Sequence, residues 1–184
     1  MKGYLFSLLI FGVGFAMSQD YKRAPNAYIF DVDLAEQYNY GGLLIPVKKA
    51  YKVWSDTEGY LKTPIPSGTQ SAALYWEDEP GLIRSVSISG SNEDAQIRVA
   101  IKRGMKGNAV ISFHVGTNGD ASDPIYWTWH VWVTDDPTKG VAYTKGFETD
   151  VLNERFTPVH MDRNLGATNA YFLGNDWHKS AGLF

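Results

Sequence analysis

The sequence predicts an all-β protein, an immunoglobulin-like antiparallel β-sandwich with long loops. Three observations lead to this fold class. From Asn26 onward, short runs rich in β-branched and aromatic residues are separated by Gly, Pro, Asn and Asp. No stretch keeps a helical period for long, although residues 33–38 are sufficient for one helical turn. The chain of 184 residues has room for one domain, or for one domain and the start of another.

Eight strands are expected along the chain, each a run of residues that favour extended backbone and each bounded by turn formers. The segments between them, such as 63–68 and 135–140, are loops and not linkers, because neither is long enough to separate two domains. The expected strands are residues 27–33, 43–47, 73–77, 82–89, 96–102, 108–115, 125–134 and 157–162.

The best-defined part of the expected sheet is the antiparallel pair formed by residues 108–115 and 125–134. The loop between them contains Asn118-Gly119, a strong turn signal. With Val115 opposite Ile125, the odd-numbered side chains of both strands form one apolar stripe, which we place in the core. The stripe consists of Ala109, Ile111, Phe113, Val115, Ile125, Trp127, Trp129 and Val131.

The even-numbered side chains of the same two strands then face outward together. His114 lies opposite Tyr126 in this register, His130 lies further along, and Trp132 continues the row. Exposed aromatic side chains stack on sugar rings or anchor protein partners. We therefore take His114, Tyr126, His130 and Trp132 as candidate ligand-binding residues. Trp54 and Tyr75 are further candidates for the surface, whereas we expect the other Trp and Tyr residues to form the core.

Charge and cysteine content exclude several classes of protein. The chain has 17 Lys+Arg against 20 Asp+Glu and a net charge of -3, which gives no electrostatic reason to bind nucleic acid or an anionic membrane surface. It has no Cys, which excludes disulfides, thiolate zinc sites, a cysteine nucleophile and a lipoprotein anchor. Nothing in the composition implies a cofactor.

The first 18 residues are expected to be a signal peptide. Lys2 precedes an apolar run, residues 4–17, which is too short for the ~20 residues of a membrane helix. Ala16-Met17-Ser18 fits the small-x-small cleavage rule, so the mature chain would begin at Gln19. We expect an exported protein, at the cell surface or extracellular, and not an integral membrane protein. The β-sandwich domain is then residues 19–163.

No catalytic or metal-binding constellation stands out. The sequence lacks Gly-x-Ser-x-Gly, and its acidic clusters adjoin turns with no apolar flank that would separate two carboxyl pKa values. His114 and His130 share a face, but no third metal ligand accompanies them. The Asn118–Asp123 loop is rich in oxygen ligands but lacks the closing Glu of a calcium loop. An ordinary hairpin loop is therefore favoured, and calcium binding by this loop is kept as an alternative.

Two motifs carry a resemblance to a known family. The first motif is the run from Tyr126 to Asp135, which contains Trp-x-Trp-His-x-Trp-Val-Thr-Asp, and the second is Met161-Asp-Arg-Asn-Leu-Gly-Ala167. Both resemble the β-sandwich modules of fimbrillin-like surface proteins. The similarity extends over residues 24–167 and also covers Ala73-Leu-Tyr-Trp-Glu-Asp78. It implies an exported, cell-surface or appendage-associated module and carries over no catalytic residue.

The same resemblance implies that residues 164–184 are the start of a truncated second, lectin-like or major-paralogous-type domain, so that the remainder of a larger polypeptide is expected to follow. The chain differs from fimbrial subunits in having no lipoprotein Cys. Our leading interpretation is a non-enzymatic module that acts in adhesion or assembly through a protein partner. A carbohydrate-binding module that holds a surface glycan is the first alternative, and a secreted hydrolase or metalloenzyme the second.

Replacing Trp129 tests the assignment of the inward side. Burying an aromatic side chain removes ~150–250 Å² from water, at ~25 cal/mol per Å². We predict that Trp129→Ala lowers the free energy of unfolding by ~3–5 kcal/mol, enough to unfold a marginally stable domain. A thermal melt measures this effect. An unchanged Tm would place Trp129 on the outer side of the sheet.

Overall fold

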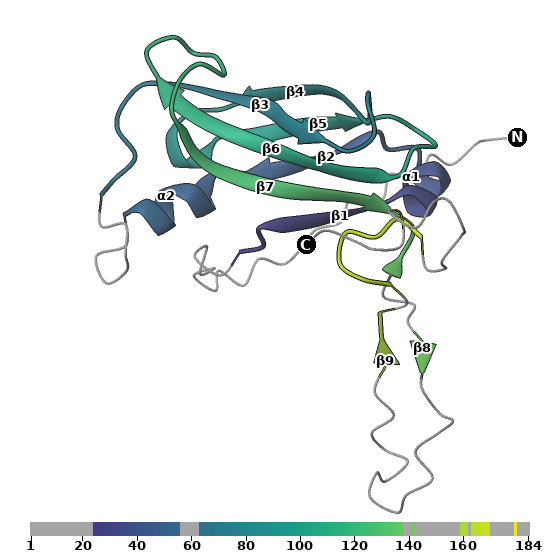
Figure 1. Ribbon diagram of the computed structural model, residues 1–184. Coiled ribbons are helices and arrows are strands. Elements are labelled where there is room, and N and C mark those ends of the chain that lie inside the picture. The colour runs from purple at the N-terminus through teal and green to yellow at the C-terminus, as the bar shows by residue number, and fades with distance from the viewer. Residues whose placement is uncertain are drawn as a thin grey trace, which may run out of the picture.

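The computed structural model describes residues 24–55, 63–137, 141–142, 159–161, 163–169 and 179. Within these ranges the chain is mostly β and contains two main sheets. Figure 1 shows the sheets as two stacked layers, with the two α-helices at opposite ends. The predicted signal peptide, residues 1–18, lies outside the described residues.

The larger sheet has four strands, in the order β1-β7-β6-β3. The smaller sheet has three strands, in the order β2-β5-β4, and is antiparallel throughout. A separate antiparallel pair, β8 and β9, lies away from both sheets (Figure 1). The bounds are β1 Ala27–Asp31, β2 Gly42–Pro46, β3 Thr69–Glu77, β4 Ile83–Ser89, β5 Gln96–Ile101, β6 Gly107–Gly116, β7 Ile125–Thr134, β8 Val141–Ala142 and β9 Val159–His160.

The seven strands of the two sheets confirm seven of the predicted runs, most with ends shifted by a residue or two. β7 has the predicted bounds, whereas β3 begins four residues earlier than predicted, at Thr69. The eighth predicted run, residues 157–162, contains β9. Composition and turn signals were therefore sufficient to place these strands along the chain.

The predicted antiparallel arrangement is wrong for one strand. β1 runs parallel to β7, so the four-stranded sheet is mixed. At the end of β1, Asp31 caps a helix, and its carboxylate accepts hydrogen bonds from the backbone N–H groups of Asp33 (2.9 Å) and Leu34 (3.0 Å). Because the chain enters a helix there and not a hairpin, no tight turn forces β1 to run antiparallel to its neighbour.

Two α-helices flank the sheets. The helical turn predicted at residues 33–38 is present as α1 (Val32–Tyr38), which ends at Asn39 in the left-handed conformation (φ 58°). The second helix, α2 (Lys48–Trp54), was not predicted, and no side chain caps its start. Contacts from other elements hold it: the Tyr51 ring lies 6.1 Å from the Phe113 ring. A short 3₁₀ turn, η2, spans Asn92–Asp94.

The predicted register of the β6–β7 pair is confirmed up to Phe113, which lies opposite Trp127. It is wrong at the loop end of the pair. There His114 lies opposite Ile125, and not opposite Tyr126 as predicted, because Tyr126 is the extra residue of a β-bulge. The bulge leaves His114 on the outer side of β6.

The core lies between the sheets and draws side chains from both. Trp129 is 1% exposed, as the prediction of an inward side requires, whereas Trp127 is only half-buried. Inward-facing side chains of β6 and β7 meet those of the three-stranded sheet in one apolar cluster. Ile125, which the sequence predicted in this stripe, is instead 43% exposed at the loop end of β7. The fully buried members from these strands are Ile45, Ile97, Val99, Ala109, Ile111, Phe113, Val115, Trp129, Val131 and Val133.

A partly buried ion pair joins the end of β7 to the segment after β9. Both terminal guanidinium nitrogens of Arg163 donate to the Asp135 carboxylate, at 2.8 and 2.9 Å, and one of them also donates to the Thr134 hydroxyl. The Arg163 side chain is 3% exposed, and Lys106 Nζ lies 2.5 Å from the same carboxylate. The hydrogen bonds from Arg163 hold the pKa of Asp135 well below its ordinary value. Burial acts in the opposite direction and raises this pKa, whereas Lys106 lowers it further.

Neutralising Asp135 tests this pair. Because the folded-state pKa of Asp135 is depressed, its contribution to stability is present above pH ~4 and is lost as the pH falls further. We predict that Asp135→Asn lowers the free energy of unfolding by ~1–3 kcal/mol near pH 7 and reduces the loss seen in acid. Urea unfolding at a series of pH values measures both. Asp94→Asn is the control, because the Asp94 side chain is 80% exposed beside Lys48; an equal effect of the two substitutions would contradict the prediction.

Candidate functional site

The four sequence-predicted site residues lie on β6 and β7, but they do not form one exposed platform. His114 is 2% exposed and Trp132 is 1% exposed, so neither can meet a ligand on the surface. Tyr126 and His130 are half-buried. The prediction of an outward platform is thus corrected for two of its four members, because two other segments cover the ends of the outer face.

The loop after β6 covers His114. The His114 ring is bonded through Nδ1 to the carbonyl oxygen of Asp123 (2.8 Å) and through Nε2 to the Ser112 hydroxyl (2.8 Å). Since a carbonyl oxygen only accepts, Nδ1 carries a proton. The Asp123 carboxylate turns back into its own loop and accepts from the backbone N–H groups of Asn118 (3.1 Å) and Gly119 (2.6 Å). This loop is therefore a closed hairpin loop that acts as a cover.

The segment after β9 covers Trp132. Its indole N–H donates to the carbonyl oxygen of Ala167 (3.1 Å), and Ala167 is 1% exposed. Asn108, next to Trp132 across the strand pair, donates to the carbonyl oxygen of Gly166 (2.8 Å). The described part of the segment predicted to start a second domain thus packs against the four-stranded sheet.

His130 belongs to a polar network at the edge of this cover. The Asn108 amide nitrogen donates to Asp78 Oδ2 (2.8 Å) as well as to Gly166, which leaves its oxygen to accept from His130 Nε2 (2.8 Å). Burial lowers the pKa of His130, and the Asp78 carboxylate partly offsets that shift. The imidazole is therefore held in a fixed orientation and favours its neutral form.

Tyr126 takes its position from the bulge in β7. Its carbonyl oxygen accepts from the indole N–H of Trp54 on α2 (2.7 Å), and the two rings meet edge to face at 5.3 Å. Trp54, a further candidate for the surface, is half-buried in this contact, whereas Tyr75 on β3 is 65% exposed. Tyr126 thus packs against the core cluster beside Trp54.

Between the two covers the outer face remains open. One cross-strand row runs from Trp76 on β3 through Val110 and His130 to Ala27 on β1, and Thr128 adjoins it. We call these five residues the outer strip. Trp76 is 42% exposed, although the sequence predicted it in the core. The register shift beside Tyr75 is the reason, since it places Trp76 next to Val110 on the outer side.

A shallow hollow of about 460 Å³ overlaps the outer strip. None of its lining residues is formally charged when the imidazole is neutral. The hollow is lined by aromatic and aliphatic side chains together with one imidazole, two hydroxyls and one amide, which suits binding by apolar contact with a few orienting hydrogen bonds. Its lining residues are Asn26, Val110, Ile125, Tyr126, Trp127, Thr128 and His130.

Within the described ranges, no three His, Cys, Asp or Glu side chains come together as a group that could hold a metal ion. At the loop considered for calcium, Asp123 is 6% exposed and bonds to backbone N–H groups, and the Asp120 carboxylate accepts from the Ser122 hydroxyl (2.5 Å) and backbone N–H (2.8 Å). Both carboxylates are thus engaged by protein donors.

Removing the His130 imidazole tests the network. Because burial lowers its pKa, the folded protein binds fewer protons than the unfolded chain below pH ~6.5, and His130 makes stability fall as the pH drops. We predict that His130→Gln loses less unfolding free energy than the wild type between about pH 7.5 and pH 5. Urea unfolding at both pH values measures the difference, because the two proteins differ only at residue 130. Equal losses would show that His130 is not held neutral.

Two further observations concern the chain as a whole. Over the residues that the structure describes, no helix is both long enough and apolar enough to cross a membrane. Comparisons with protein-family models, with curated proteins and with solved structures find no match for this chain.

Proposed function

We propose that the chain is an exported, non-enzymatic, immunoglobulin-like module of a cell-surface or fimbrial-type protein, and that it acts in adhesion or assembly by binding a protein partner with its outer strip. The observation that carries the proposal is the outer strip itself, an uncharged and mainly apolar surface left open on a sheet whose two ends are covered. Exposed apolar patches with polar rims mark interaction sites.

The strand order supports the immunoglobulin-like part of the proposal. Such folds, with strands lettered in chain order, place the third, sixth and seventh strands in one sheet and the second, fourth and fifth in the other. The orders β7-β6-β3 and β2-β5-β4 agree with this division. β1 differs, since it joins the edge of β7 and not that of β2. The two sheets are also held by one continuous core.

The composition of the outer strip favours a protein over the other candidate partners. Trp is enriched at the centres of protein interfaces, where charged side chains are depleted. A glycan platform on this face would need Trp132 and His114 at the surface, and both are buried. A hydrolase would need a nucleophile and base or paired carboxylates in a pocket, and none of these lines the hollow.

The amino terminus supports export. Lys2 and the uncharged run that follows it have the pattern of a secretory signal, and cleavage after Ser18 would release the module. Because the chain has no Cys, no disulfide stabilises it, and an exported module of this sequence would depend on its core.

The proposal is tested by titrating the purified chain onto intact cells of the strain that makes it. We predict saturable binding that Trp76→Glu weakens by about tenfold or more, because a charge at the strip would be desolvated in the interface. Leu44→Glu is the matched control, since Leu44 is 50% exposed on the three-stranded sheet.

The chemical class of the partner is determined by repeating the binding measurement on cells treated with protease or with periodate. Protease treatment of the cells is expected to abolish the part of the binding that depends on Trp76, and periodate oxidation of their glycans is expected to leave it intact. Equal binding by Trp76→Glu and wild type, or Trp76-dependent binding that resists protease, would overturn the proposal.

A further inference from the structure

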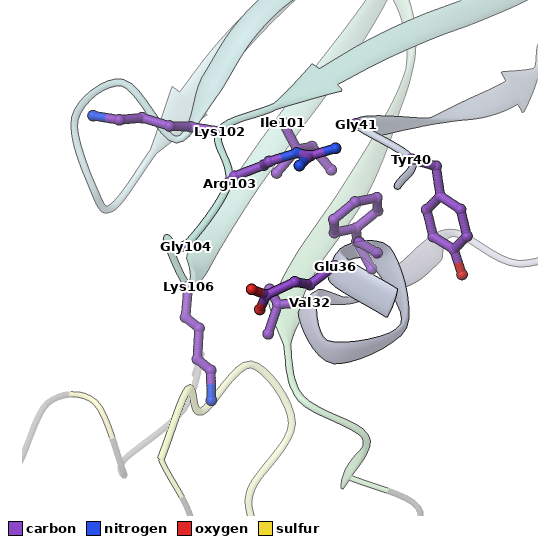
Figure 2. Close-up of a pocket in the computed structure, with 11 residues that line it drawn as sticks. Val32, Glu36, Tyr40, Gly41, Ile101, Lys102, Arg103, Gly104 and Lys106 are labelled. Atoms are coloured by element: carbon purple, nitrogen blue, oxygen red, sulfur yellow. The ribbon is translucent and has the colours of Figure 1, made fainter. Parts of the chain in front are cut away.

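A second pocket lies between α1 and the turn that joins β5 to β6. It encloses about 370 Å³, within the range of ~300–1,000 Å³ usual for small-ligand sites. Figure 2 shows α1 on one side and the turn carrying Arg103 and Gly104 on the other. None of the sequence-predicted site residues lines this pocket, and it shares no lining residue with the hollow on the outer face.

The floor of the pocket is apolar. Phe30 from β1, Ala35 from α1 and Ile101 from β5 line it, and they are 7%, 5% and 2% exposed. These three residues also belong to the core cluster, so the floor is as rigid as the packing beneath it. A ligand seated there would meet a fixed hydrophobic surface.

One wall of the pocket is aromatic. Tyr40 is 43% exposed, and its ring meets Phe30 edge to face at 6.3 Å and lies parallel to the ring of Tyr38, 6.3 Å away. The backbone holds Tyr40 in place, because its N–H donates to the carbonyl oxygen of Ala35 (3.1 Å) after the left-handed turn at Asn39. The end of α1 thus presents a pair of exposed tyrosine rings beside an apolar floor.

The rim carries opposite charges that do not pair with each other. The Glu36 carboxylate faces the space between α1 and the β5–β6 turn, whereas the Lys102 and Lys106 side chains extend away from it (Figure 2). Within the described ranges Glu36 makes no hydrogen bond or ion pair, and Lys106 is bound to Asp135. Arg103 donates to Asn39 Oδ1 and keeps further N–H donors for another acceptor.

This arrangement selects for a neutral ligand. An anion would pair with Arg103 but be repelled by Glu36, and a cation would pair with Glu36 but be repelled by Arg103. A purely apolar ligand would desolvate both groups without giving either a partner. A ligand with several hydroxyls both accepts from Arg103 and donates to Glu36. If it also has an apolar face, that face packs on Tyr40 and on the floor.

We propose that this pocket binds a neutral sugar ring, with Tyr40 as the stacking residue and Glu36 and Arg103 as its hydrogen-bonding partners. A pyranose ring combines an apolar face with a rim of hydroxyls that donate and accept. The proposal goes beyond adhesion through the outer strip and does not depend on it, since the two surfaces share no residue.

The test uses the full chain and a panel of free sugars: glucose, galactose, mannose and N-acetylglucosamine as neutral probes, glucosamine as a cationic probe and N-acetylneuraminic acid as an anionic probe. We expect at least one neutral sugar to bind with a Kd in the millimolar range or tighter by calorimetry. Its binding should shift the backbone NMR signals of Tyr40 and Arg103. Failure of every neutral sugar, or a preference for either charged sugar, would overturn the proposal.

Variants locate the site. Tyr40→Ala is expected to weaken the binding of the neutral sugar by about tenfold or more. Tyr75→Ala, which removes a still more exposed tyrosine from β3, is expected to leave it unchanged. Glu36→Gln provides a second test that does not depend on the packing of Tyr40: it should improve the binding of N-acetylneuraminic acid relative to the neutral sugar. Sugar binding that both pocket variants leave unaltered would place the site elsewhere.

A variant of the outer strip distinguishes sugar binding in the pocket from the proposed binding of a protein partner. Trp76→Glu should bind the neutral sugar as well as the wild type does, and Tyr40→Ala should keep the protease-sensitive binding to cells. Loss of sugar binding on Trp76→Glu would show that the two surfaces form one site and would contradict an independent sugar pocket.

Discussion

The antiparallel pairing of β6 with β7 is the constraint on which the rest of the structure depends. Its inward-facing side chains fill the space between the sheets, and Trp129 and Phe113 are the largest of them that are fully buried. Every other strand of the four-stranded sheet pairs with one member of this pair, β1 with β7 and β3 with β6. The three-stranded sheet closes the same interior from the opposite side. A slip of one residue would exchange the core and outer sets, so packing holds the register.

The same pairing creates a second requirement on its outer side. Asn108, His114 and Trp132 carry polar atoms there that need partners once they are covered. The loop after β6 supplies the Asp123 carbonyl, and the segment after β9 supplies the carbonyls of Gly166 and Ala167. These covers are rigid because each is bonded to side chains of the sheet that it covers. The outer strip is what remains between them, and its position follows from the placement of the polar groups at both ends.

Local signals predicted the strands well, because alternation and turn residues act over a few positions. The features that sequence reasoning missed are non-local. Trp132 is buried by a residue 35 positions away, α2 is held by Phe113 and Tyr126, and β1 joins a strand about 100 residues later. The register shift beside Tyr75 reversed the expected side of Trp76, and no pattern in the alternation marks it. In the candidate site, the positions of Tyr126 and His130 beside the hollow could be predicted from the alternation along β7. The burial of Trp132 and His114 under the two covering segments could not.

The two candidate surfaces lie on different sides of β1. Ala27 joins the outer strip beside His130, and Phe30, three residues later, enters the floor of the pocket, because successive side chains of a strand point to opposite faces. The two surfaces also differ in chemistry, since one is uncharged and open and the other combines an aromatic wall with a carboxylate and a guanidinium. A protein partner on the strip and a small ligand in the pocket would therefore approach from different sides and would not compete for space.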